Sequence, residues 1–264
     1  MQPAAIDWIS KGIRRHFEAM DEELRLASRL QKEMLPPEKL SFGPAAFSTM
    51  YRPCAWVSGD IIDIIAVDPA HVAFYLADVA GHGVAAGLLT MYVKHAVCPR
   101  RLDRPGQPPA SPSEVLTQLN EKLVSERLRD SLFVTAWYGL LNRETMRLDY
   151  ATAGHPPAIH VSSGLVRELH ADGGLLGLLS GAEFVGGSVQ LARQDRIVVY
   201  TDGLEGVLIQ NRPRLPLTPD WMEGIEPLLI GPTESVLSGV EGRLNASPGS
   251  LNKADDVTMI VLDV

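Results

Sequence analysis

In each of four segments of the chain, an aspartate lies either where an apolar run meets a glycine turn or where an apolar run begins. The four carboxylates are those of Asp60, Asp78, Asp202 and Asp255. Apolar runs lead directly into Asp78 and Asp202, and a glycine that follows lets backbone or solvent come close. One such aspartate is usually a turn residue or a helix cap. Four in one chain are harder to explain in that way.

Carboxylates brought together at neighbouring strand ends repel one another, which raises their pKa values unless a cation lies between them. The chain offers oxygen ligands and no Cys/His set at metal-ligand spacing, so the expected ion is Mg²⁺ or Mn²⁺. Two such ions about 3.5–4 Å apart can lower the pKa of a bridging water and neutralise a phosphoryl oxygen. The spacing is therefore compatible with a metal-dependent hydrolase but does not establish one.

Other residues near these segments are weighed in the same way. Asp63 and Asp256 are partners of the ligands, or ligands of a further ion, or surface carboxylates. His82 is a general acid or makes a structural hydrogen bond, and we leave it out of the catalytic set. His155 is expected to shape a turn before two prolines. Asn120 is expected to cap the wall of the cleft.

The composition of the chain argues against several classes of function. The 264 residues are 45% hydrophobic and 21% charged, which is typical of a globular chain. A net charge of −8 argues against sequence-independent nucleic-acid binding and against anionic membranes. The most apolar long stretch, Phe74 to Val93, contains Asp78 and His82 and fails as a membrane span. Without a signal-peptide core, and with only Cys54 and Cys98, a cytoplasmic location is expected.

Residues 1–37 are predicted to form a long amphipathic helix, from Ala4 to Leu35, that ends at Pro36-Pro37. A heptad-like seam alternates spacings of four and three residues, and Leu26 and Leu30 on a neighbouring face could dock onto the following domain. The seam is either a packing element or a dimer interface, and the pattern leaves both open. Its members are Ile13, Phe17, Met20, Leu24, Ala27, Gln31 and Met34.

Residues 38–264 are predicted to form one domain of short strands with few helices. Helical patterns cover Val84–Val97, Ser113–Arg129 and Thr233–Asn245, and exposed connections cover Arg100–Pro112 and Asn211–Pro219. Because strands come in antiparallel-style runs, an α+β layered sandwich is favoured over a parallel sheet. Trp137 and Tyr138 are expected to pack in its core. The expected strands are Ala45–Tyr51, Ile61–Val67, Val72–Ala77, Leu132–Leu141, Arg147–Ala153, Ala158–Val161, Leu165–Leu169, Ser188–Leu191, Arg196–Thr201 and Val257–Val261.

Several segments, in order, resemble the SpoIIE branch of the PPM metal-dependent protein phosphatases. The resemblance begins in the helix near Leu24 and covers nearly everything to Val264. No single motif is decisive, but the ordered set is specific. The matching stretches are Leu26–Gln31 with Leu35-Pro36-Pro37, Ser58-Gly59-Asp60 with Asp63, Asp78–Gly83, Phe133-Val134-Thr135 with Tyr138-Gly139, Ala153–Pro157, Tyr200–Gly203 and Asp255–Thr258.

The resemblance implies a four-layer α-β-β-α sandwich of two antiparallel sheets flanked by helices, with metals at one edge. It implies that Asp78 bridges two Mn²⁺ or Mg²⁺ ions, with a third ion left open. The Val79 carbonyl, Asp202 and Asp255 would complete the ligand set, and Asp60 would act directly or through coordinated water. A metal-activated water would then hydrolyse phosphoserine or phosphothreonine on a partner protein, which in this branch is commonly an anti-sigma-factor antagonist.

The chain departs from the branch pattern in two places. Ser58-Gly59-Asp60-Ile61-Ile62 replaces Gly-Gly-Asp followed by aromatic residues, and the phosphate-binding arginine of eukaryotic relatives has no clear counterpart other than Arg52. These departures predict weak metal affinity until a partner or an upstream domain orders the site. The rival reading is a phosphatase-like scaffold in a sigma-factor pathway that binds without turnover.

The expected setting is bacterial signal transduction and stress response. We expect the chain to be the output half of a longer protein, preceded by a receiver or other sensory domain, as in two-component response regulators. Its helix would pair two copies into a homodimer and transmit the input.

Overall fold

The apolar runs form strands in two antiparallel sheets. The computed structural model describes residues 3–81, 83–99, 107–127, 132–208, 227–246 and 255–264. The six-stranded sheet has the order β1-β2-β11-β10-β7-β8 and the five-stranded sheet has the order β3-β4-β5-β6-β9. The strands are β1 Lys39–Phe42, β2 Ala45–Arg52, β3 Asp60–Ala66, β4 His71–Val79, β5 Val134–Asn142, β6 Arg147–Ala153, β7 Ala158–Ser162, β8 Leu165–Leu169, β9 Gly186–Gln190, β10 Arg196–Tyr200 and β11 Val257–Asp263.

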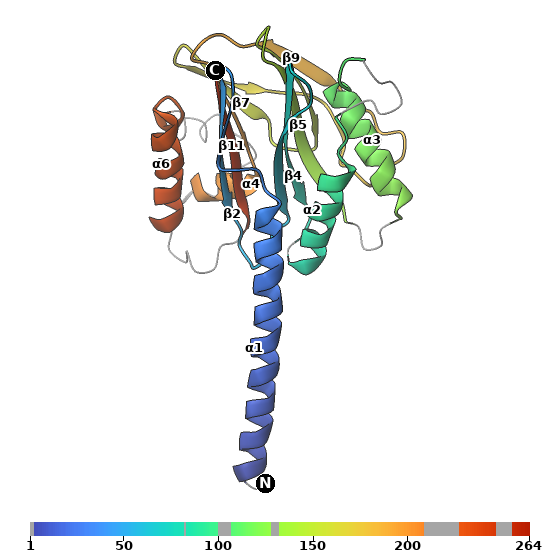
Figure 1. Ribbon diagram of the computed structural model, residues 1–264, viewed down its shortest axis with the longest axis vertical. Coiled ribbons are helices and arrows are strands. Elements are labelled where there is room, and N and C mark those ends of the chain that lie inside the picture. The colour runs from blue at the N-terminus through green and yellow to red at the C-terminus, as the bar shows by residue number, and fades with distance from the viewer. Residues whose placement is uncertain (1–2, 82, 100–106, 128–131, 209–226, 247–254) are drawn as a thin grey trace.

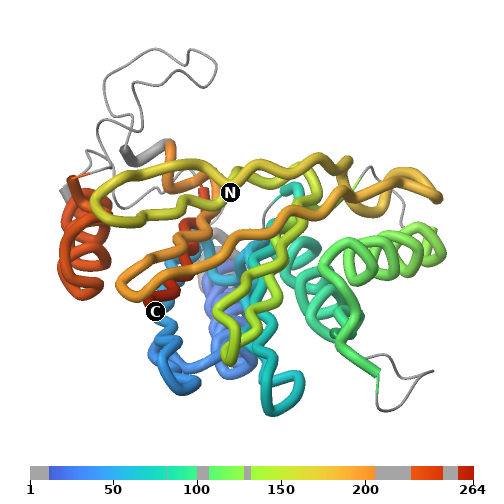
Figure 2. Tube along the Cα trace, turned by 90° about the horizontal axis from the view of Figure 1, so that it is seen from above, coloured from blue at the N-terminus to red at the C-terminus, as the bar shows by residue number. Residues whose placement is uncertain are grey.

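Helices cover the outer faces of both sheets (Figures 1 and 2). Helices α2 (Val84–Ala96) and α3 (Pro112–Ser125) pack on the five-stranded sheet. Helices α4 (Asp202–Leu208) and α6 (Thr233–Ala246) pack on the six-stranded sheet. A third apolar cluster fills the space between the sheets. The predicted four-layer α-β-β-α sandwich is thus confirmed.

The central strands are apolar on both faces because both faces are covered. In β4 every residue from Val72 to Ala77 is buried, with alternate side chains in the inner and the outer cluster. Trp137 and Tyr138 are fully buried on opposite faces of β5, so their predicted packing role is confirmed.

Most predicted elements lie within a few residues of the observed ones, and β6 and β8 have the predicted bounds. Two elements were missed: the short edge strand β1 and helix α4. Helix α3 begins at Pro112, one residue before the predicted start, because Ser111 is its N-cap and forms a capping box with Glu114. The expected connection Asn211–Pro219 lies outside the described residues, as does part of Arg100–Pro112.

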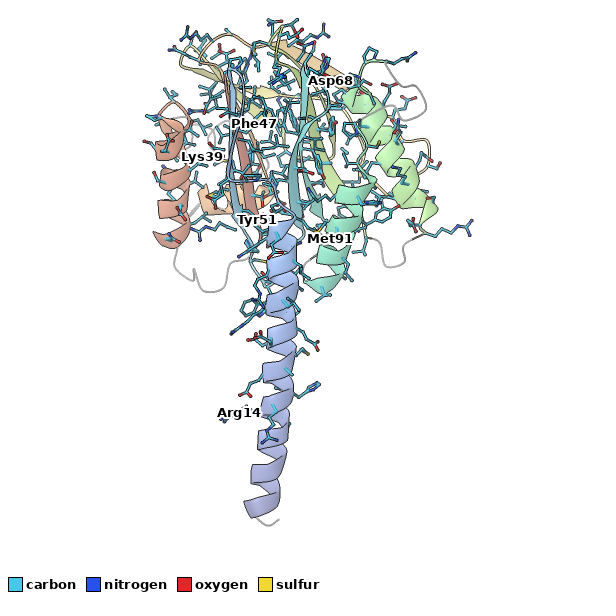
Figure 3. The ribbon with its side chains drawn as sticks, viewed as in Figure 1. Arg14, Lys39, Phe47, Tyr51, Asp68 and Met91 are labelled. Carbon is cyan, nitrogen blue, oxygen red and sulfur yellow. The ribbon has the colours of Figure 1, made fainter. Side chains whose placement is uncertain are left out.

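Helix α1 (Pro3–Glu33) is present as predicted and projects from the sandwich, with Arg14 on the projecting part (Figures 1 and 3). The prediction that Leu26 and Leu30 dock onto the domain is wrong, since these side chains are 50% and 54% exposed. Ser28 and Gln31 are buried instead, and Leu35 packs against two apolar clusters. Helix α1 therefore contacts the domain through the face that carries Ser28 and Gln31, and not through the face that carries Leu26 and Leu30.

The projecting part of α1 leaves the first half of the predicted seam uncovered. Ile13, Phe17 and Met20 are 53%, 62% and 48% exposed. The boundary at residue 37 between the helical segment and the following domain stays a prediction.

None of the helices in the described part of the chain combines the length and the apolar character that a membrane span requires.

Candidate metal centre

The inner face of the five-stranded sheet ends in a polar row. Asp60, Asp78 and Thr135 are successive cross-strand partners on β3, β4 and β5. Strand alternation puts Asp60 on the same face as Ile62, and Asp78 on the same face as Leu76, and both apolar residues belong to the cluster between the sheets. The polar row is therefore the last layer of the sandwich interior.

The six-stranded sheet supplies the opposing row. The Thr258 hydroxyl donates to Oδ2 of Asp60 at 2.5 Å, and the Thr201 hydroxyl donates to the same oxygen at 3.1 Å. Tyr51, the cross-strand partner of Thr258, lies at the end of the sandwich from which α1 projects (Figure 3). Both hydroxyls bind one carboxylate oxygen, so the other oxygen of Asp60 is the one left for further ligands.

Asp60 is only 1% exposed. Burial, followed by the carboxylate of Asp78, holds the pKa of Asp60 well above its usual range, while the bonds from Thr258 and Thr201 act in the opposite direction. The sequence-based expectation that neighbouring carboxylates raise one another's pKa is met at this residue.

Three oxygens face one small space over Gly59. A β-carbon added at Gly59 would lie 2.9 Å from the Val79 carbonyl oxygen, 3.0 Å from the Gly81 carbonyl oxygen and 3.5 Å from Oδ1 of Asp78. The Val79 amide donates to the Gly59 carbonyl at 3.0 Å, which fixes the two segments to each other. Glycine is required here because any side chain would fill the space that these oxygens line.

The start of α4, which carries Asp202, meets the segment that carries Asp255 and Asp256. A β-carbon at Gly203 would lie 1.9 Å from the Asp256 carbonyl oxygen, so only glycine allows this approach. Asp202 and Asp255 are exposed. Burial raises the pKa of Asp78 to about 8, and the charges of Asp202 and Asp255 contribute to this rise. The charges of Asp202 and Asp255 thus reach Asp78.

Asp256 is a positioning residue, and the surface reading of it is wrong. It is 4% exposed, and its carboxylate accepts the Gly59 amide at 2.8 Å and the Cys54 amide at 2.6 Å. These bonds fasten the 54–59 segment, which precedes Asp60, to the start of β11.

Gln31 connects helix α1 to the same segment. Its amide group donates to the Ser58 carbonyl at 2.9 Å and to the Thr90 hydroxyl at 3.1 Å, and it accepts the Ser58 amide at 3.0 Å. The Ser58 hydroxyl in turn accepts the Asp60 amide at 3.0 Å. Gln31 occupies an apolar slot of the seam because its polar atoms are satisfied inside the domain.

The side chains of three other candidates are engaged by groups outside the set of predicted acids. Asp63 points to the outer face of β3 and forms an ion pair with Lys94 of α2, so strand alternation separates it from Asp60. Arg52 forms an ion pair with Glu241 of α6. Asn120 does not cap the cleft: its side chain accepts the Gly177 amide and donates to the Leu179 carbonyl. His82 lies outside the described residues.

The ligand chemistry of the site fits a hard divalent cation. The three atoms nearest to the space over Gly59 are oxygens, and the nearby acids need a positive charge to be ionised together. In the part of the chain that the structure describes, no three His, Cys, Asp or Glu side chains are already clustered as metal ligands.

Sequence reasoning missed the residues that support the acids. Thr201 and Thr258 stand next to or near the predicted ligands, and their position on inner-facing strand ends was the available signal. The sequence predicts only that His155 shapes a turn, whereas its buried ring also bonds Thr135 on β5 and the Tyr200 carbonyl on β10.

Comparison with known proteins assigns the chain to a family. The family model described as Stage II sporulation protein E (SpoIIE) matches residues 68–264. The chain belongs to the SpoIIE family. All but one of the predicted site residues, including Asp78, Asp202 and Asp255, fall within the matched range.

Two curated relatives of this SpoIIE-family chain come from Bacillus subtilis (strain 168). Phosphoserine phosphatase RsbP is 27% identical over 254 residues, which are 92% of this chain and 58% of RsbP. Phosphoserine phosphatase RsbU is 26% identical over 246 residues, which are 91% of this chain and 69% of RsbU. The chain therefore spans less than two thirds of RsbP.

Solved structures share the fold. The SiaA-PP2C domain of Pseudomonas aeruginosa matches with a TM-score of 0.75 at 20% identity, covering 94% of this chain and 98% of that domain. RsbX in complex with magnesium matches with a TM-score of 0.60 at 16% identity, covering 85% of this chain and 97% of RsbX. The SpoIIE-family chain thus has a PP2C-like fold.

Proposed function

We propose that the chain is a metal-dependent protein serine/threonine phosphatase that hydrolyses phosphoserine or phosphothreonine on a partner protein. The observation that carries the proposal is the convergence of Asp78 and the Val79 carbonyl over Gly59, with Asp202 and Asp255 in electrostatic reach. The comparisons support the proposal because RsbP and RsbU are both named phosphoserine phosphatases.

Mn²⁺ or Mg²⁺ would be held by five groups from four segments. Asp78 would serve both ions, and the Val79 carbonyl, Asp202 and Asp255 would complete the ligand set, with Asp60 acting directly or through water. Such ions supply Lewis-acid activation of water and neutralise phosphoryl oxygens. RsbX, which has the same fold, was solved with magnesium.

The protein's own contribution is to hold these oxygens in place. The hydroxyls of Thr201 and Thr258 bind Oδ2 of Asp60 and so fix the direction of its Oδ1. Gly59 and Gly203 let two pairs of segments approach more closely than any side chain allows. Rigid placement of this kind is what metal-assisted hydrolysis requires of the protein.

The alternative is a scaffold of the same fold that binds a sigma-pathway partner without turnover. One observation favours it: Arg52, considered as the phosphate-binding arginine, is engaged by Glu241 on α6. Retention of all four predicted acids favours the enzyme, because a scaffold has no need to hold carboxylates whose closeness raises the pKa of Asp78.

Hydrolysis of p-nitrophenyl phosphate with added Mn²⁺ separates the two readings. We expect turnover by the natural chain and its loss in Asp78→Asn and Asp202→Asn. Asp63→Asn is the matched control, since Asp63 lies on the opposite face of β3. Absence of Mn²⁺-dependent turnover in the natural chain, or full activity in Asp78→Asn, contradicts the phosphatase.

We further propose that the substrate is a phosphorylated anti-sigma-factor antagonist in a bacterial stress response, and that the reaction takes place in the cytoplasm. The support is the similarity to RsbP and RsbU. Phosphoserine, phosphothreonine and phosphotyrosine peptides at equal concentration test the class, and preferential release of phosphate from the tyrosine peptide contradicts it.

The exposed seam of α1 supports a homodimer that receives its signal from an upstream receiver or sensory domain. Ile13, Phe17 and Met20 are the uncovered part of that seam, and Gln31 bonds the docked end of the helix to the segment before Asp60. Sedimentation equilibrium is the test: the natural chain should be dimeric, and replacing all three exposed side chains by glutamate should make it monomeric. A monomeric natural chain contradicts the proposal.

A further inference from the structure

His155 lies where the chain passes from one sheet to the other. It belongs to the short connection between β6 of the five-stranded sheet and β7 of the six-stranded sheet, and it is 7% exposed. The Thr152 hydroxyl donates to its carbonyl at 3.2 Å, which secures the backbone of the connection. The backbone of the connection is thus fixed at His155, whose side chain is buried.

The imidazole joins the two sheets through its two nitrogens. Nδ1 lies 2.9 Å from the Thr135 hydroxyl on β5, and Nε2 lies 3.1 Å from the Tyr200 carbonyl oxygen at the end of β10. A carbonyl can only accept, so Nε2 carries the proton and Nδ1 accepts from Thr135. Burial lowers the pKa of His155 to about 3, which keeps the ring neutral and in this tautomer.

Each end of this bridge is next to an acid of the candidate metal centre. Thr135 is the direct cross-strand partner of Asp78. Tyr200 is the last residue of β10 and stands two residues before Asp202, the first residue of α4. The connection Asp78–Thr135–His155–Tyr200–Asp202 therefore spans the gap between the half of the site on the five-stranded sheet and the half on the six-stranded sheet.

We propose that His155 is a positioning residue of the metal centre, whose neutral ring sets the separation between the Asp78 side and the Asp202 side. The inference rests on the proposed function, since it needs a metal at these acids. A residue that only shaped the turn would act on folding. A positioning residue must also act on the affinity of the folded protein for metal.

Two substitutions of Thr135 remove or keep the bridge with little change of volume. Thr135→Val deletes the hydroxyl that donates to Nδ1, and Thr135→Ser retains it. Calorimetric titration with Mn²⁺ at a temperature where all variants are folded should show a Kd raised about 10-fold in Thr135→Val, the lower end of what loss of a supporting hydrogen bond costs a metal site. Thr135→Ser should restore the natural Kd.

His155→Gln tests the ring itself and should weaken Mn²⁺ binding in the same direction. Its matched control is His160→Gln, because His160 is also buried in the sandwich but bonds Asp195 and Arg167 instead of the site. The control should lower the Tm and leave the Kd for Mn²⁺ unchanged. If His155→Gln does not fold, the difference in Kd between Thr135→Val and Thr135→Ser decides whether the bridge positions the metal centre.

The outcomes are distinguishable. If the natural chain binds no Mn²⁺, both the proposed function and this inference are overturned. If the natural chain binds Mn²⁺ and Thr135→Val binds it equally well, only the role of His155 is wrong. The same holds if His160→Gln weakens metal binding as much as His155→Gln, because the effect would then follow from general loss of stability.

Discussion

Asp78→Asn should make the metal-free protein more stable near neutral pH. The structure raises the pKa of Asp78 from an ordinary value of 3.8 to about 8, through burial and the charges of Asp202 and Asp255. Folding therefore favours the protonated acid, so this contribution to stability is full below pH 3.8 and is lost as the pH rises toward 8. Asparagine resembles the protonated acid in shape and carries no charge to repel its neighbours.

The magnitude follows from the pKa difference. At 1.36 kcal/mol for each pH unit above the unfolded pKa, keeping the Asp78 carboxyl protonated in the folded state costs at most about 4 kcal/mol at pH 7. Neighbouring acids share the repulsion and some solvent reaches the group, so we expect a measured gain of about 1–2 kcal/mol. For a domain of this size that is a rise in Tm of about 3–6 °C.

Thermal unfolding in EDTA, followed at pH 4, 5.5, 7 and 8, measures the difference between Asp78→Asn and the natural chain. The gain should be near zero at pH 4 and grow with pH. Saturating Mn²⁺ should reverse the order at pH 7, because only the natural chain gains about 2.7 kcal/mol from a ligand at 100 times its Kd. A variant that is less stable than the natural chain in EDTA at every pH would refute the electrostatic reasoning.

Three further outcomes are expected. Gly59→Ala should abolish Mn²⁺-induced stabilisation, because its β-carbon would lie 2.9 Å from the Val79 carbonyl oxygen; Gly242→Ala, with open space around it, should leave that stabilisation intact. Asp63→Asn should leave the calorimetric Kd for Mn²⁺ unchanged, and a weakened Kd would mean that the outer face of β3 contributes to the site. Asn120→Ala should lower the free energy of unfolding in urea by about 1–3 kcal/mol, because it leaves two main-chain groups without their partner, and should not alter metal binding. A loss of metal affinity in Asn120→Ala would restore its predicted place at the cleft.

Strand positions were readable from the sequence because apolar runs and turn residues are local signals. The runs before Asp78 and Asp202 become β4 and β10, and Arg147–Ala153 is found with its predicted bounds. β1 was missed because a four-residue edge strand buries too little apolar surface to show a period.

The docking face of α1 could not be read in the same way. Several faces of the helix carry apolar residues, and the sequence does not say which one meets the sandwich. Leu26 and Leu30 looked like contacts but are exposed, while polar Gln31 is buried because Ser58 and Thr90 satisfy its amide group. A buried glutamine is stable only if partners from distant segments are in place, and no local pattern reveals them.

The sequence by itself determined which acids the protein would offer, since an aspartate at the end of an apolar strand next to a glycine is recognisable from neighbours a few residues away. Only the tertiary structure decided which of them meet. Strand parity turned Asp60 inward and Asp63 outward, and packing of the two sheets brought Thr201 and Thr258 onto Asp60. The physical reason is that hydrogen bonds and charge repulsion between these groups depend on distances in space across more than 100 residues of chain, which local propensities do not encode.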